Sequence, residues 1–186
     1  MTSDYETKNS SKKLILPVNI GTDHIRGSIN APLTIVEYGD YECPYTGMAY
    51  PVVKEIMRRF DEKVYFVFRN FPLREIHPHA QHAAEAAEAA SAQDKFWQMH
   101  DYLFEHQKAL DDHHLLEYAQ KVGLDIERFK KEFSRHIYAP IINESLKSGI
   151  DSGVQGTPTF FINGERYEES WDLDTLTSYL KRRVPG

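Results

Sequence analysis

The order of strand-like and helix-like segments constrains the fold of this chain most. Residues 33–38 (LTIVEY) and 63–69 (KVYFVFR) are rich in β-branched and aromatic residues, which is typical of strands. Between them, residues 44–60 carry apolar side chains at helical spacing. A strand, a helix and a second strand in this order predict a βαβ unit with a right-handed crossover.

A long helical stretch separates this unit from a second group of strands. Every segment within residues 78–152 has the apolar spacing of a helix. Residues 159–162 (TFFI) then predict a strand, and Asn163-Gly164 predicts a tight hairpin turn after it. Asp172 is a favourable N-cap for a last helix. The chain therefore predicts an α/β fold of order βαβ, helical insertion, ββα.

One domain accounts for the length of the chain. A sequence of 186 residues has the size of one domain, or of one domain with an insertion. Residues 1–28 predict a flexible lead-in with residues 14–18 as a candidate edge strand, and residues 29–186 predict the folded domain with its insertion at 78–152. The single cysteine forms no intramolecular disulfide, so the hydrophobic core must stabilise the fold.

Charge and hydropathy argue against two classes of partner. The chain has 22 basic and 28 acidic residues, a net charge of −6, which disfavours nucleic acid. No apolar run approaches the roughly 18 residues of a membrane span, and residues 1–13 lack the apolar region of a signal peptide. We therefore expect no membrane insertion and a reducing, cytoplasmic location. A segment trimmed from an exported or fused protein would have the same features, and the oligomeric state stays open.

Cys43 stands where a thiol is chemically activated. It lies between the end of a predicted strand and the start of a predicted helix, and Pro44 suits the first helical turn. The helix dipole and the free backbone N–H groups favour the thiolate at such a position. The alternative is a small buried hydrophobic residue, the commoner role of a lone cysteine.

Glu37 interrupts a strand that is otherwise apolar. A charged, unpaired carboxylate inside such a strand is costly. Glu37 is therefore either a buried proton acceptor that influences Cys43 or a side chain that reaches solvent at the end of the strand. We favour the first and expect its pKa to be raised, because burial disfavours the charged form.

Three histidines in close succession suggest a metal site. His77, His79 and His82 are of the residue type that binds zinc. Pro78 and His79 begin a predicted helix, however, so that the three imidazoles do not obviously converge on one point. We expect surface or capping roles for them, no metal site and no resident cofactor.

The sequences around Cys43 and Pro158 carry a family resemblance. Residues 43–46 (CPYT) are similar to the C-P-Y-C or C-P-H-C motif of DsbA-like thiol–disulfide oxidoreductases in the thioredoxin superfamily. Residues 156–159 (GTPT) resemble the family's G-[TV]-P loop, and residues 160–164 (FFING) match its F-x-[IV]-[ND]-G strand and turn. Glu37 matches its buried acidic residue. The helical insertion resembles that of a branch found free in the bacterial cytoplasm or fused to transporters.

The resemblance implies a thioredoxin fold with the helical insertion between the second strand and a strand that follows a cis-proline. It implies four catalytic residues: Cys43, Thr46, Pro158 and Glu37. Tyr41 and Tyr45 flank the sulfur, and we expect them to form the substrate surface together with Pro44 and Thr157. The backbone of Thr157 would then bind an extended peptide by strand addition.

Thr46 departs from the family pattern. It replaces the second cysteine, which resolves the mixed disulfide in the family, so the resemblance implies a monothiol enzyme. Such an enzyme exchanges with protein or small-molecule thiols and disulfides, glutathione among them as a co-substrate, while Thr46 donates a hydrogen bond to the Cys43 thiolate. Two other functions stay open: a non-catalytic binding or regulatory module, and a glutathione-dependent transferase. The substrate, the reductant and whether Thr46 is native or engineered stay open too.

Overall fold

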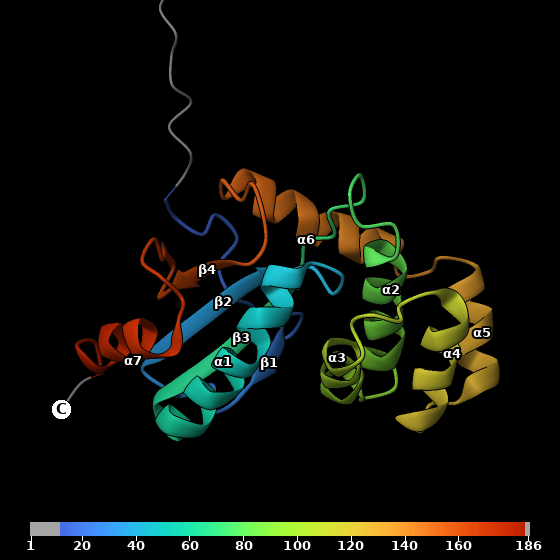
Figure 1. The fold of residues 1–186 in the computed structure, drawn as a ribbon, viewed down its shortest axis with the longest axis horizontal. Helices are drawn as coiled ribbons and strands as arrows, with labels where there is room; N and C mark the ends of the chain where they lie inside the picture. Colours follow the sequence, from blue (N-terminus) through green and yellow to red (C-terminus); the bar gives the residue numbers. More distant parts are fainter. Residues whose placement is uncertain (1–11, 185–186) are drawn as a thin grey trace, which may run out of the picture.

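A five-stranded mixed sheet organises the protein. The computed structural model describes residues 12–184 (Figure 1). The strands are β1 (His24–Arg26), β2 (Leu33–Gly39), β3 (Val64–Asn70), β4 (Thr159–Ile162) and β5 (Glu165–Arg166). Their order is β1-β3-β2-β4-β5; β2 and β3 are parallel, and the other pairs are antiparallel. The predicted βαβ unit and the later pair of strands are thus confirmed.

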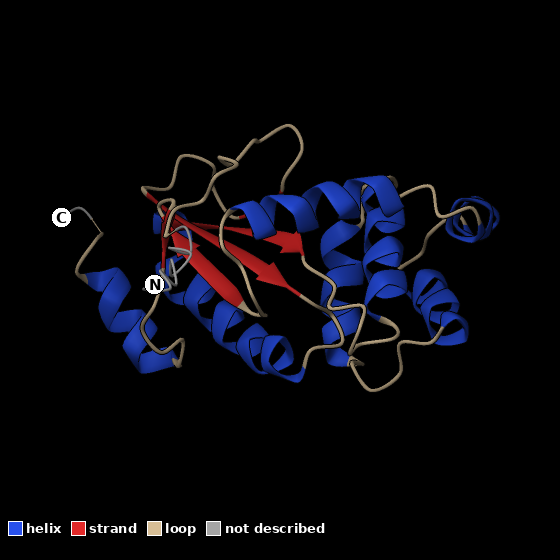
Figure 2. Cartoon of the chain, turned by 90° about the horizontal axis from the view of Figure 1, so that it is seen from above, coloured by secondary structure: helices blue, strands red, loops and turns tan. Residues whose placement is uncertain are grey.

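Helices cover both faces of this sheet. α1 (Pro44–Phe60), followed by a 3₁₀ turn at Asp61–Lys63, packs with α7 (Leu173–Lys181) on one face, and α6 (Ala139–Asp151) lies on the other (Figure 2). The remaining helices of the insertion are α2 (Ala80–Ser91), α3 (Phe96–Glu105), α4 (Asp112–Lys121) and α5 (Ile126–Ser134). None of the helices in the described part of the chain has both the length and the apolar character needed to cross a bilayer.

The alternation of side chains along β2 divides the core into two clusters. Ile35 joins the larger cluster, which includes residues of α1 and α7 together with Phe68 of β3. Val36 and Tyr38 join the smaller cluster on the opposite face, toward α6. Because neighbouring residues of a strand point to opposite faces, Glu37 shares the face of Ile35 and lies on the α1 side.

The edge strand predicted at residues 14–18 is wrong. Residues 14–18 form no strand, and the two edge strands of the sheet are β1 and β5. The carbonyl groups of Leu16 and Pro17 instead accept hydrogen bonds from the guanidinium of Arg69, at 2.8 and 3.1 Å. Leu14 N–H donates to the Gly164 carbonyl at 2.8 Å, at the turn between β4 and β5. The residues after it run along the Arg69 side chain, because a buried cation needs such acceptors. The described part of the predicted lead-in therefore packs on the domain, and residues 1–11 lie outside the described residues.

Candidate active site

Cys43 is the N-cap residue of α1, and its thiol lies at the N-terminal end of that helix. Its backbone is extended, with φ −70° and ψ 121°, and Pro44 occupies the start of the helix. The Cys43 carbonyl accepts a hydrogen bond from Gly47 N–H at 3.0 Å. The thiol Sγ donates to the carbonyl oxygen of Thr157 at 3.3 Å. Cys43 is only 3% exposed, so this thiol is held in place and nearly covered.

The loop before β4 meets Cys43 because of the strand register. Tyr38 of β2 pairs with Thr159 of β4 in antiparallel fashion. The residues that follow Tyr38 and those that precede Thr159 therefore lie at the same end of the two paired strands. The Thr157–Pro158 peptide bond in this loop is cis. The Thr157 hydroxyl is buried and has no hydrogen-bond partner within the described part of the chain.

Thr46 is fully buried one helical turn after Cys43. Its hydroxyl accepts a hydrogen bond from Asp40 N–H at 3.5 Å. Its methyl group lies beside Gly39. Position 39 has no room for a side chain, because a Cβ atom there would come within 2.4 Å of the Phe68 ring. The expected hydrogen bond from Thr46 to Cys43 is not among those formed by the described residues, because the hydroxyl is directed to the loop backbone.

Glu37 is buried within the sheet, at 3% exposure. Burial disfavours the charged carboxylate and raises its pKa to about 8. The sequence left open whether the Glu37 side chain is buried or reaches solvent at the end of the strand. The structure agrees with the buried position. At neutral pH the side chain is mainly protonated and neutral, on the α1 face of the central strand.

Tyr41 does not belong to the substrate surface, contrary to the expectation from the sequence. It is 1% exposed, and its hydroxyl lies 3.0 Å from Nδ1 of His100 in α3. Its ring packs against those of Phe68 and Phe104, with centroids 5.2 and 4.9 Å away. The ring fills the space between the sheet and α3, which is why it is not available to a substrate. Pro44 and Tyr45 are exposed, Tyr45 at 63%.

Met48 is an exposed apolar residue that the sequence analysis did not include in the site. It lies on α1 one turn beyond Tyr45 and is 60% exposed. The two side chains share a helix face because residues three apart on a helix are neighbours. The surface next to Cys43 is therefore apolar along the first turns of α1.

Asp40 organises the loop between β2 and α1, and the sequence analysis missed it. Its buried carboxylate accepts hydrogen bonds from Glu42 N–H at 2.8 Å and from Leu73 N–H at 2.9 Å. It also pairs with Nδ1 of His77 at 2.7 Å. An acidic residue at the end of a strand is visible in the sequence. Its partners could not be predicted from the sequence, because they lie in the distant loop after β3.

Two of the three clustered histidines pair with carboxylates of the Cys43 loop. His77 pairs with Asp40, and His79 pairs with Glu42 at 2.8 Å. His82 points elsewhere, to Asp112 at 2.6 Å. Within the described residues, no group of three or more His, Cys, Asp or Glu side chains is arranged to hold a metal ion. These histidines dock the loop after β3 onto the active-site loop.

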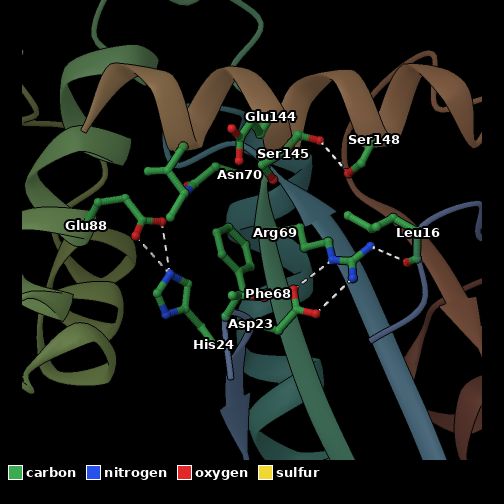
Figure 3. Close-up of a pocket in the computed structure, with 12 residues that line it drawn as sticks. Leu16, Asp23, His24, Phe68, Arg69, Asn70, Glu88, Glu144, Ser145 and Ser148 are labelled. Carbon is green, nitrogen blue, oxygen red and sulfur yellow. Dashed lines mark hydrogen bonds and ion pairs between the residues drawn. The ribbon is translucent and has the colours of Figure 1, made fainter. Parts of the chain in front are cut away.

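A cavity of about 190 Å³ at the end of β3 lies apart from this site (Figure 3). Four of its charged groups form two pairs: Arg69 with Asp23 at 2.8 Å, and His24 with Glu88 at 2.9 Å. All five N–H groups of Arg69 donate to acceptors of the protein. Cys43 does not line this cavity, and we assign no reaction to it.

Comparison with known proteins decides the family. A family model described as thioredoxin matches residues 19–182. The chain belongs to the thioredoxin family. BdbD from Bacillus subtilis, in its oxidised form, superposes with a TM-score of 0.80 at 23% identity and covers 95% of this chain and 98% of its own. A thioredoxin-like oxidoreductase from Silicibacter pomeroyi DSS-3 superposes with a TM-score of 0.76 at 26% identity, covering 86% and 91%.

A protein of the DsbA group is similar too. The thiol–disulfide exchange protein alpha-DsbA2 from Wolbachia pipientis superposes with a TM-score of 0.75 at 23% identity, with 87% of each chain covered. The α/β thioredoxin fold with its helical insertion is therefore confirmed, and the resemblance to DsbA-like proteins is confirmed as a likeness of fold.

Curated relatives are closer in sequence but much longer. The Na(+)/H(+) antiporter NhaA 1 of Salinispora arenicola is 46% identical over 173 residues, which are 93% of this chain and 26% of the antiporter. NhaA 3 of Salinispora tropica is 44% identical over 165 residues, which are 89% of this chain and 25% of that protein. The chain thus spans about a quarter of the length of the curated relatives it matches.

Proposed function

We propose that this thioredoxin-family protein carries out thiol–disulfide exchange through Cys43 alone. One observation carries the proposal: Cys43 is the N-cap residue of α1 and its thiol donates to the Thr157 carbonyl, while a threonine stands at position 46. The family fold supports the exchange chemistry, and the single cysteine of the sequence supports the monothiol form.

The reaction has two exchange steps. In the first, the Cys43 thiolate attacks a disulfide R–S–S–R′, a bond forms between Sγ and the sulfur of R, and R′ leaves as a thiolate. In the second, an external thiolate attacks this mixed disulfide, pairs with R and releases Cys43 as a thiolate. The sulfur of R′ is reduced to a thiolate while the external thiol is oxidised into a disulfide with R, so electrons balance without a resident cofactor.

The residues around Sγ assist these steps. The free N–H groups in the first turn of α1 stabilise the thiolate that attacks and the thiolate that is released. When Cys43 loses its proton, it no longer donates to Thr157, whose carbonyl then becomes free for a backbone N–H of a peptide substrate. Tyr45 and Met48 offer apolar contact area for such a partner.

Thr46 determines which thiol completes the cycle. A threonine forms no disulfide, so the mixed disulfide waits for a thiol from another molecule. Glutathione and protein thiols are the two sources in this proposal. We also propose a reducing, cytoplasmic location, which suits an enzyme whose one cysteine must return to the free thiol.

The experiment uses a peptide joined to glutathione by a disulfide. Release of the peptide thiol is followed with glutathione, glutathione reductase and NADPH as the regenerating system. We expect release with the wild type and background rates with Cys43→Ser. Equal rates for the two proteins would contradict the proposal.

A second function has support of its own. The antiporter relatives contain a segment that matches nearly all of this chain, and Cys43 is almost covered. A non-catalytic module that binds or regulates a transporter segment would agree with both observations. Such a module keeps its partner affinity in Cys43→Ser, whereas the exchange enzyme loses its activity in the same variant.

A further inference from the structure

We infer that Gln107 is a positioning residue that holds the backbone of the Cys43 loop in its reactive conformation; this rests on the proposed function. Gln107 follows the end of α3 and is partly buried. Its Nε2 donates to the carbonyl of Tyr41 at 2.9 Å and to the carbonyl of Cys43 at 2.8 Å. A carboxamide has two N–H hydrogens, and this geometry uses both on one loop.

Gly47 provides the space that this contact needs. A Cβ atom at position 47 would lie 2.2 Å from Oε1 of Gln107 and 2.8 Å from its Cδ. Glycine inside a helix costs roughly 1 kcal/mol relative to alanine. The close approach of Gln107 explains why α1 has a glycine in its first turns.

The two hydrogen bonds fix the peptide groups Tyr41–Glu42 and Cys43–Pro44, which enclose Glu42 and Cys43. The Cys43 carbonyl also accepts the first hydrogen bond of α1, from Gly47 N–H at 3.0 Å. Its orientation therefore sets both the start of the helix and the direction of the Cys43 side chain toward Thr157. Gln107 thus acts on the sulfur through the backbone, without touching it.

The insertion controls this loop at two points. Tyr41 inserts its side chain against His100 and Phe104 of α3, and Gln107 binds the loop backbone just beyond the same helix. On the other side, Asp40 binds the loop after β3. The helical insertion is therefore a support for the active site and not only a cover.

The test compares the same isosteric substitution, glutamine to glutamate, at two positions of the helical insertion. Gln107→Glu replaces the donating NH₂ group by an oxygen that repels both carbonyls. Gln98→Glu makes the same change at an exposed position of α3 and is the matched control. The measurements are the rate of Cys43 alkylation as a function of pH and the rate of exchange with the glutathione-linked peptide.

We expect Gln107→Glu to shift the pH midpoint of alkylation and to slow exchange roughly tenfold, as misplacement of a reacting group does. Gln98→Glu should match the wild type in both measurements. If Gln107→Glu lowers stability but leaves the pH profile and the exchange rate unchanged, its role is structural and the inference is wrong.

A stability cycle keeps the inference testable if Gln107→Glu does not fold. Gly47→Ala should lower the free energy of unfolding in the wild type, where it displaces Gln107, and raise it in a Gln107→Ala background, where helix propensity dominates. The same effect in both backgrounds would overturn the inference. If the wild type shows no exchange at all, the proposed function fails, whereas this cycle still reports on Gln107.

Discussion

The thiol of Cys43 donates a hydrogen bond to the carbonyl oxygen of Thr157 across 3.3 Å, although 114 positions separate the two residues in the chain. The antiparallel pairing of β2 with β4 brings Cys43 and Thr157 together at one end of these two strands. Neither residue is placed by its own loop alone. The site is therefore a product of the whole fold, and changes in the supporting residues should alter it.

Glu37→Gln should change how stability depends on pH. The folded-state pKa of about 8 lies above the ordinary value of 4.5, so the folded protein binds a proton that the unfolded chain has lost. The favourable contribution is complete below about pH 4.5 and is lost as pH rises through about 8. Across that window the wild type loses on the order of 1 kcal/mol of unfolding free energy per pH unit.

Denaturant unfolding at pH 5 and pH 8 measures this effect. Glutamine does not ionise, so Glu37→Gln should gain stability relative to the wild type by on the order of 3 kcal/mol between the two pH values. Glu165→Gln, which changes an exposed carboxylate of β5, should run parallel to the wild type. A parallel profile for Glu37→Gln would show that the carboxyl group titrates normally.

Thr46→Cys should convert the protein into a dithiol enzyme. The new thiol would stand one helical turn after Cys43, where it resolves the mixed disulfide within the same molecule. Intramolecular resolution should raise insulin reduction with a dithiol reductant roughly tenfold or more. Ser178→Cys, which adds an exposed second thiol on α7, should stay at the wild-type rate. A wild type that already matches Thr46→Cys would contradict the monothiol account.

Tyr41→Phe should destabilise the protein although it removes a single oxygen atom. Burial lowers the pKa of His100 well below its ordinary value, so the ring is neutral and its Nδ1 depends on the Tyr41 hydroxyl. Leaving a buried polar group unpaired costs about 1–3 kcal/mol. Thermal or denaturant unfolding measures the loss. Tyr45→Phe, at an exposed position, should change stability by less than about 0.5 kcal/mol, and equal effects of the two changes would disprove the account of Tyr41.

Local signals in the sequence predicted much of the fold. The residue pattern gave β2, β3, β4 and α1, because alternation and helical spacing are properties of short segments. Asp172 caps the last helix as expected.

The side-chain partners within the site could not be predicted in the same way. The burial of Tyr41 depends on α3, and the anchoring of Asp40 depends on His77 from the loop after β3. Gln107 contacts Cys43 across 64 positions of the chain. These pairs form only when distant elements pack, and one sequence does not reveal which elements meet.

Intact mass after treatment of the native protein with oxidised glutathione tests the central claim most directly. The account predicts one glutathionyl adduct per chain on Cys43, fully removed by a thiol reductant, and no adduct on Cys43→Ser. The denatured wild type serves as the control that the reagent modifies an accessible cysteine. A native chain that stays unmodified while the denatured chain is modified would contradict the claim that Cys43 is a working nucleophile.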